Sequence, residues 1–183
     1  MNEAAFWDVI EGARTTADGD AQIMAEALAA GFADADDETL RGFQTQLVAV
    51  HERLYTWRHG SAAEMVCGFV SDDVFTDWRS WVISLGRETF ERVADDPDNL
   101  ADVETLSDGC EGVGESFGAA VANIYYARHG YEDEQFPVVE LSESPSGEPL
   151  TDLAAIRTSL PRLSERIPND GLGQGPGSFA EDD

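Results

Sequence analysis

Three carboxylates near the start of a predicted helix have the spacing that best suits chemistry in this chain. Asp72 and Asp73 follow Ser71, and Asp77 comes one helical turn after Asp73. Carboxylate oxygens suit a hard divalent cation, so a carboxylate-based, metal-dependent enzyme that uses these side chains is one hypothesis. Asp72 and Asp73 also stand where a helix N-terminus favours negative charge, and Asp77 suits a solvated face. The simpler interpretation is structural: we expect no metal site, with Asp73 and Asp77 as the alternative pair of ligands.

Two arginines and two tryptophans surround these carboxylates in the sequence. Arginine suits bidentate pairing with a carboxylate in partly buried places, and Asp98 follows the proline of a predicted turn. We therefore expect a structural clasp that joins Asp98 to Arg79 or Arg87. The alternative is an arginine that binds an anionic ligand, with Trp78 or Trp81 stacked beside it.

Other motifs that resemble catalytic sites lack the context that those sites need. Residues 114–118 read GESFG, the G-x-S-x-G pattern of a nucleophile elbow, but no strand precedes them and they fall within a predicted helix. His51, His59 and His129 are too few and too scattered for a zinc site, and we expect His51 to be a hydrogen-bonded, partly buried side chain. Since no catalytic set is recognisable, the sequence favours a protein that is not an enzyme and has no cofactor.

The charge of the chain limits its partners. Of 183 residues 37 are acidic and 11 are arginine, there is no lysine, and the net charge is −26. Binding to nucleic acid or to an anionic membrane surface needs clustered positive charge, so we expect neither. The acidic residues are spread evenly along the sequence, which is typical of a solubility property. An acidic inhibitor or immunity-type protein for a basic partner remains an alternative.

The compartment that we expect is the cytoplasm. No apolar run reaches the length of a membrane span, and the first residues, MNEAAFWDVI, are acidic and unlike a signal peptide. Cys67 and Cys110 have no partners at metal-site spacing. We expect both to be free thiols, because a disulfide needs an oxidising compartment.

Helical spacing of apolar residues dominates the N-terminal half of the chain. A first helix is indicated by the amphipathic stripe of Phe6, Val9, Ile10 and Ala13. A second is expected over residues 22–32, with Ile23, Leu28 and Phe32 as its apolar anchors. The clearest helix has apolar residues at alternating steps of three and four, typical of bundle packing: Leu40, Phe43, Leu47, Val50, Leu54 and Trp57. We expect it to continue to Arg58, Gly60 to end it, and residues 61–64 to open the next helix as a capping box.

The remaining elements follow from cap and turn residues. Ser71 is a good N-cap, Gly86 suits a helix end, and residues 96–99 (DPDN) have turn chemistry. A strong helix follows Gly112, and residues 136–141 could form a short extended piece. The predicted fold is all-α: a single-domain bundle of about seven helices over residues 1–167, then a disordered, acidic, glycine-rich tail over residues 168–183.

Three stretches of the chain resemble the bacterial family catalogued as domain of unknown function 4240, some members of which also carry a WGR domain. These stretches are FWDVIEGA, SDDVFTDWRSWVISLGRETFERVADDPDNLAD and LPRLSERI. The resemblance covers residues 5–167 and implies no established activity. Its motif positions are Asp72, Asp73, Phe75, Arg79, Trp81, Gly86, Phe90, Pro97, Asp98 and Leu100. Val70 and Val74 stand where glycine or cysteine is commoner, so they leave less room for any ligand that those small residues would admit.

The density of specific residues over 71–101 makes this segment the predicted site. We expect a cytoplasmic binding or regulatory module that acts through protein or small-ligand contacts. The candidate contact residues are Asp72, Asp73, Arg79, Trp81, Arg87 and Asp98. The oligomeric state does not follow from the sequence.

Overall fold

The computed structural model describes residues 1–131, 133–138 and 144–167. Its α-helices are α1 (Glu3–Thr16), α2 (Ala21–Phe32), α3 (Asp37–Arg53), α4 (Trp57–Cys67), α5 (Asp72–Ser84), α6 (Arg87–Asp95), α7 (Val113–His129), α8 (Leu153–Ser159) and α9 (Pro161–Arg166). Two 3₁₀ helices, η1 (Pro97–Asp102) and η2 (Leu106–Cys110), lie between α6 and α7. The predicted all-α class is confirmed. The predicted extended piece extends into residues 139–141, and the tail spans 168–183; both of these ranges lie outside the described residues.

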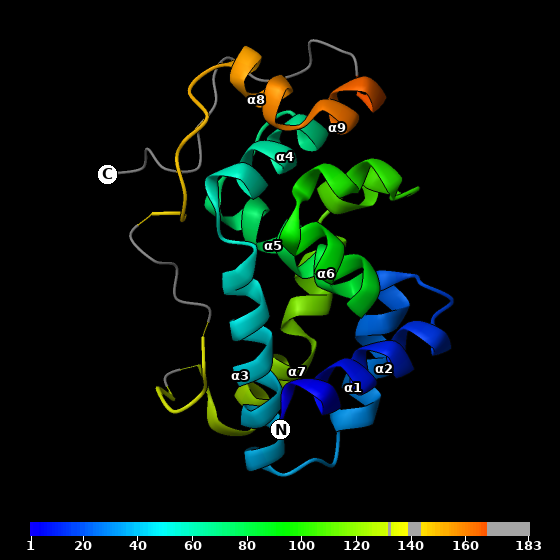
Figure 1. Cartoon of the computed structure of the whole chain (residues 1–183). Coiled ribbons are helices and arrows are strands. Elements are labelled where there is room, and N and C mark those ends of the chain that lie inside the picture. Colours follow the sequence, from blue (N-terminus) through cyan, green and yellow to red (C-terminus); the bar gives the residue numbers. More distant parts are fainter. Residues whose placement is uncertain (132, 139–143, 168–183) are drawn as a thin grey trace.

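Helix α7 is the centre of the bundle. It packs against α2, α3 and α5, while α1 lies on the outer side of α2 (Figure 1). The short helices α8 and α9 lie at the other end of the molecule, where α9 packs on η1 and α8 on α4 (Figure 1). In the described part of the chain, no helix combines the length and the apolar character needed to cross a membrane.

Local cap chemistry starts most of the helices. The N-cap side chains that accept a hydrogen bond from a backbone N–H in the first turn are Asn2, Asp20, Asp36, Thr56, Ser71 and Asp152. The predicted cap Ser71 is among them, with the Val74 N–H donating to its hydroxyl at 3.3 Å. Gly86, between α5 and α6, has a φ of 89°, a conformation that favours glycine, as expected for a helix end.

The predicted boundary between the third and fourth helices is wrong. Helix α3 ends at Arg53, and α4 begins at Trp57 with Thr56 as its N-cap. Gly60 and Ser61 therefore lie inside α4 and are buried, so no capping box forms there. Leu54 is fully buried and Trp57 is half-buried, so the apolar spacing in the sequence continues across a break in the helix.

One predicted anchor of the second helix is also wrong. Ile23 is 47% exposed, and the buried residues of α2 are Met24, Ala25, Leu28 and Phe32. The buried face of α2 thus begins one residue later, at Met24, and includes Ala25 as well as the predicted anchors Leu28 and Phe32.

Helices α5 and α7 approach each other closely because α7 presents glycines to α5. A Cβ atom on Gly114 would lie 1.8 Å from the Asp77 carbonyl oxygen, and one on Gly118 would lie 2.6 Å from the Ser80 hydroxyl. Backbones can pack at this distance only where one helix has no side chain. The GESFG pattern lies within a helix, as predicted, and its glycines serve packing.

The two cysteines form a disulfide, which corrects the expectation of free thiols. Cys67, the last residue of α4, is bonded to Cys110, the last residue of η2, with Cα atoms 5.4 Å apart. The prediction failed because it considered compartment and local spacing, whereas the pair forms when the chain folds back over 43 positions.

Candidate functional site

Arg79, the most conspicuous residue of the 71–101 segment, is fully buried in α5. Its guanidinium donates hydrogen bonds to the carbonyl oxygens of Phe75 and His51, both at 3.3 Å, and to the Thr76 hydroxyl at 3.1 Å. It also lies about 5 Å above the ring centres of Tyr55 and Phe75. Burial lowers the pKa of Arg79 to about 10, so the group stays charged at neutral pH. Its position inside the core leaves no part of it for a partner to touch.

Trp81 is equally enclosed. Its side chain is 2% exposed and its ring centre is 6.2 Å from that of Trp78. Gly109 of η2 lies directly against the ring: a Cβ atom there would be 2.6 Å from a ring carbon. Trp81 therefore joins α5 to η2 as a core residue.

The predicted clasp between Asp98 and an arginine is wrong. The Asp98 carboxylate accepts hydrogen bonds from the backbone N–H groups of Arg162 and Leu163, at 3.2 and 2.9 Å, and so caps the start of α9. Arg87 lies 3.7 Å from Glu3 of α1, and both side chains are about half exposed. The free backbone N–H groups at the start of a helix can satisfy a buried carboxylate as well as a guanidinium can.

The three carboxylates of α5 have different surroundings. Asp72 and Asp73 are exposed in the first turn, whereas Asp77 is half-buried. Burial, then the charges of Glu115 and Asp73, raises the pKa of Asp77 to about 6. Within the described residues, no group of three or more His, Cys, Asp or Glu side chains could hold a metal ion. The structure thus brings Asp73 and Asp77 near each other without completing a metal site.

His51 and Ser80 form a contact that the sequence did not reveal. The His51 Nε2 atom is 3.0 Å from the Ser80 hydroxyl, and both side chains are at most 3% exposed. Such a pair resembles a nucleophile and its base, but Gly118 closes over the Ser80 hydroxyl and leaves no space for a substrate. Burial, then the charge of Arg79, lowers the pKa of His51 to about 3, so the ring is neutral at physiological pH.

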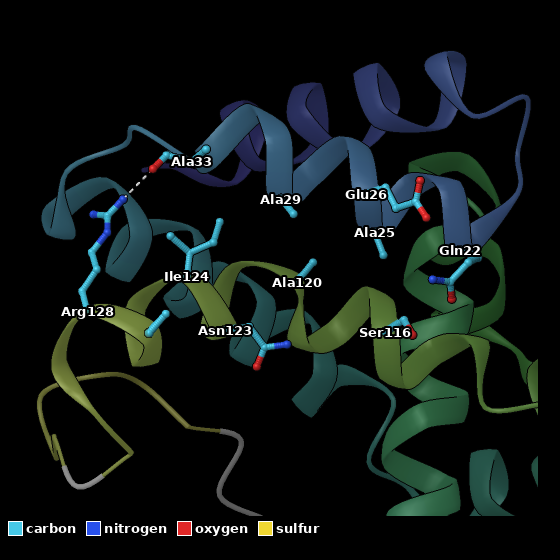
Figure 2. Close-up of a pocket in the computed structure, with 11 residues that line it drawn as sticks. Gln22, Ala25, Glu26, Ala29, Ala33, Ser116, Ala120, Asn123, Ile124 and Arg128 are labelled. Carbon is cyan, nitrogen blue, oxygen red and sulfur yellow. Dashed lines mark hydrogen bonds between the residues drawn. The ribbon is translucent and has the colours of Figure 1, made fainter.

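The described surface does have an open groove, and it lies between α2 and α7. Its volume is about 590 Å³, and Figure 2 shows the side chains that line it. The lining residues are Gln22, Ala25, Glu26, Ala29, Ala33, Ser116, Ala120, Asn123, Ile124, Ala127 and Arg128. We call this feature the α2–α7 groove.

Small side chains create the groove. Ala25, Ala29 and Ala33 recur every four residues along α2 and face Ala120 and Ile124 of α7 (Figure 2). The alanine methyl groups are too small to fill the depression between the two packed helices. Its apolar floor therefore stays open to solvent. The signal in the sequence is the alanine spacing in QIMAEALAAGFA. The prediction missed it because it used only the larger apolar residues of this helix.

The charged residues at the rim of the groove leave a negative charge that can interact with an occupant. The Arg128 guanidinium donates hydrogen bonds to the carbonyl oxygens of Ala33 and Ala35 at 2.8 and 2.7 Å and lies 3.4 Å from Asp37. It therefore serves to close the end of α2. Glu26 is exposed on the opposite side of the groove, so its charge is available to an occupant.

Most arginines of the protein, like Arg128, bind carboxylates or backbone carbonyls of the chain itself. Arginine ion pairs within the described residues include Arg14 with Glu11, Arg53 with Glu91, Arg58 with Asp96, Arg87 with Glu3, Arg92 and Arg162 with Asp102, and Arg128 with Asp37. Arg166 donates to backbone carbonyls of η1 and the residues after it. Because the chain has no lysine, the surface keeps a large excess of carboxylates.

A family model described as "Protein of unknown function (DUF4240)" matches residues 1–132. This stretch contains α1 to α7, and so both the 71–101 segment and the α2–α7 groove. Helices α8 and α9 lie outside it. No curated protein and no solved structure matches the chain.

Proposed function

Because the chain belongs to the family of unknown function DUF4240, which brings no activity with it, we propose a function from the geometry: a binding or regulatory module that docks a basic protein segment in the α2–α7 groove. The observation that carries this proposal is the open, alanine-lined floor between two packed helices. The 71–101 segment supports the fold beneath this surface and does not itself make the contact.

The shape of the groove suits an amphipathic helix. A third helix laid between two others packs its apolar side chains into the depression between them, and alanines allow its backbone to approach closely. Ile124 and the alanine methyls supply apolar contact, while Gln22 and Asn123 at the rim supply hydrogen-bonding groups. A single small molecule would have fewer contacts with so open a surface.

The charge of the groove and of the whole chain determines which kind of helix can bind there. Glu26 lies at the rim, Arg128 is paired with Asp37, and the whole chain carries a net charge of −26. A helix with lysine or arginine beside its apolar face is attracted over several ångströms, whereas an acidic one is repelled. The same argument covers an inhibitor or immunity-type protein that acts on a basic partner. A metal-dependent reaction has no comparable support from the arrangement of Asp72, Asp73 and Asp77.

We place this activity in the bacterial cytoplasm. Two cysteines in 183 residues are too few for the disulfide framework typical of small secreted domains. The resemblance of the central motif to a bacterial family supports the source. Nucleic acid and anionic membrane surfaces are not proposed as partners, because the exposed charge is negative.

Synthetic peptides test the proposal. One amphipathic helical peptide carries alanine and leucine on one face and lysines on the other, and its matched control carries glutamates in place of the lysines. Fluorescence anisotropy should show binding of the lysine peptide that weakens as salt is added, and no binding of the glutamate peptide.

A pair of variants on α2 then locates the contact. Ala29→Trp fills the groove and should weaken binding of the lysine peptide by about tenfold or more. Ala30→Trp places the same side chain on the exposed face beside it and should change the affinity by less than about twofold. Equal effects of the two variants, or equal binding of the two peptides, would refute docking in the groove.

A further inference from the structure

The Cys67–Cys110 disulfide is placed where solvent thiols can reach it. Cys110 is an exposed residue and Cys67 is half-buried at the end of α4. Structural disulfides in secreted domains persist because the compartment is oxidising, whereas those of reducing compartments are typically transient, catalytic or redox-sensing. An accessible bond fits the second class if the protein works in the cytoplasm, as proposed above.

The bond holds a segment that has few other attachments. Neither η2 nor α7 begins with a side-chain cap, and η2 contributes Leu106 and Gly109 to the buried surface. Gly109 rests on the Trp81 ring without a side chain of its own. Loss of the covalent link therefore leaves η2 held mainly by these two contacts, whereas Val103 and Glu104 before it stay bonded to Arg166, and local opening of η2 becomes easier.

We propose that Cys67–Cys110 is a reversible thiol–disulfide exchange site whose co-reactant is a thiol. A thiolate attacks the Cys110 sulfur, the Cys67–Cys110 bond breaks, and Cys67 leaves as a thiolate that takes a proton from water. A second thiol then attacks the mixed disulfide, which releases the oxidised co-reactant and the Cys110 thiol. Two thiols supply the two electrons, and oxidation by a disulfide of the same class reverses both steps.

The charge around the bond selects among thiols. Asp108 and Glu111 flank Cys110, and no lysine is present anywhere in the chain. The glutathione thiolate carries a net negative charge and is repelled, whereas the cysteamine thiolate is a zwitterion whose ammonium group balances its charge, so it is not repelled. Reduction by cysteamine should therefore be faster by about tenfold at low salt, at equal thiolate concentration, and the difference should shrink as salt is added.

Reduction of this bond should also change binding in the α2–α7 groove, an inference that rests on the proposed function. Residues 111 and 112 connect Cys110 to the first turn of α7, and Ser116 of the following turn lines the groove. Freeing η2 loosens this end of α7, so the reduced protein should bind the lysine peptide several-fold more weakly than the oxidised protein.

Hydrogen exchange on the whole chain tests the site without any partner. Wild-type protein is compared in its oxidised form, after reduction by cysteamine, and as the double variant Cys67→Ser with Cys110→Ser. We expect both thiols to become alkylatable together while the protein stays folded, and amide exchange to rise by about tenfold within residues 106–116 but not within α3. The double variant should match the reduced wild type.

Several outcomes would overturn the proposal. If cysteamine reduces the bond only after urea is added, the disulfide is structural. If reduction speeds amide hydrogen exchange over the whole chain, the protein unfolds globally. Unchanged exchange within residues 106–116 removes the local release. If exchange rises there and peptide affinity stays equal, the coupling to the groove is refuted. Failure of the oxidised protein to bind the peptide refutes the proposed function alone, because alkylation and hydrogen exchange need no peptide.

Discussion

The 71–101 segment and the α2–α7 groove use opposite kinds of residues and serve opposite purposes. The segment holds large side chains such as Trp78, Arg79 and Trp81, and the fold buries all three. Five of the eleven residues that line the groove are alanines, and it stays open to solvent. In this protein, the large residues that stand out in the sequence lie in the core, whereas small residues line the groove that we propose as the binding surface.

The difference follows from how helices pack. Large side chains and a buried guanidinium are stable only where neighbours surround them, so a dense cluster of them becomes a core. Alanine adds little volume, so two helices that present alanines along one side leave a depression. Substitutions should therefore cost stability in the segment and cost binding in the groove.

The largest expected loss of stability is that of Trp81→Ala. Removing a fully buried indole leaves a cavity between α5 and η2, and we expect the free energy of unfolding to fall by about 3–5 kcal/mol. Urea denaturation followed by circular dichroism measures this loss. Ile23→Ala, at an exposed position of α2, is the matched control and should change stability by less than about 0.5 kcal/mol. Similar values for both variants would contradict the assignment of Trp81 to the core.

Gly114→Ala should come next. The new methyl group would meet the Asp77 backbone carbonyl, which cannot rotate away, so α5 and α7 must separate. We expect a loss of about 3 kcal/mol in the free energy of unfolding. Gly12→Ala in α1 meets nothing within 4 Å and should be neutral or stabilising by up to about 1 kcal/mol. If Gly114→Ala is tolerated as well as Gly12→Ala, the close approach of α5 and α7 is incorrect.

Acid should destabilise the core through its two buried histidines. Burial lowers the pKa of His51 to about 3 and that of His59 to about 4, from an ordinary value of 6.5. The unfolded chain therefore binds protons between pH 6.5 and about 4 while the folded protein does not, and stability falls as the pH falls through this window. We expect the two histidines together to cost about 3–4 kcal/mol between pH 7 and pH 5.

A double variant isolates this effect from the general charge of the chain. Lower pH also relieves repulsion among the carboxylates, which acts in the opposite direction. His51→Gln with His59→Gln should remove the histidine contribution and flatten the fall in unfolding free energy measured by urea denaturation. An unchanged slope in the double variant would show that neither ring is kept neutral by burial.

The smallest expected effect on stability is that of Asp77→Asn. The pKa of Asp77 is raised to about 6, so the folded protein binds more protons than the unfolded chain between about pH 4 and pH 6. Ionisation of this group thus lowers stability as the pH rises through that window. At pH 7.5 the variant should be more stable by about 1 kcal/mol after solvent screening, with no difference near pH 3. Equal thermal unfolding temperatures at pH 7.5 would contradict the raised pKa.

Local chemistry allowed much of the fold to be predicted from the sequence. Ser71 capped its helix, Gly86 ended it, and the GESFG pattern lay within a helix, because caps and glycine conformations depend on a few neighbouring residues. The break at Thr56 was missed because the apolar spacing of Leu54 and Trp57 persists across it. The spacing reports which face is buried and says little about whether the backbone is continuous.

The site was harder to predict because it depends on tertiary neighbours. Asp98 had a plausible arginine partner in the sequence, yet α9, more than 60 positions away, supplies its donors. The disulfide and the groove have the same origin: Cys67 meets Cys110, and Ala29 faces α7, only once the helices pack. The alanine spacing of α2 is visible in the sequence, but no local pattern shows which helix those alanines face or that the two cysteines meet.

The most direct test of the account measures stability and binding together on one variant from each region. Arg79→Ala should lose about 2–4 kcal/mol of unfolding free energy and, under conditions where it stays folded, bind the lysine peptide with the affinity of the wild type. Ala29→Trp should keep the unfolding free energy within about 0.5 kcal/mol and lose affinity for the peptide by about tenfold. The reverse result, with peptide binding lost in a stable Arg79→Ala protein and retained in Ala29→Trp, would contradict the account.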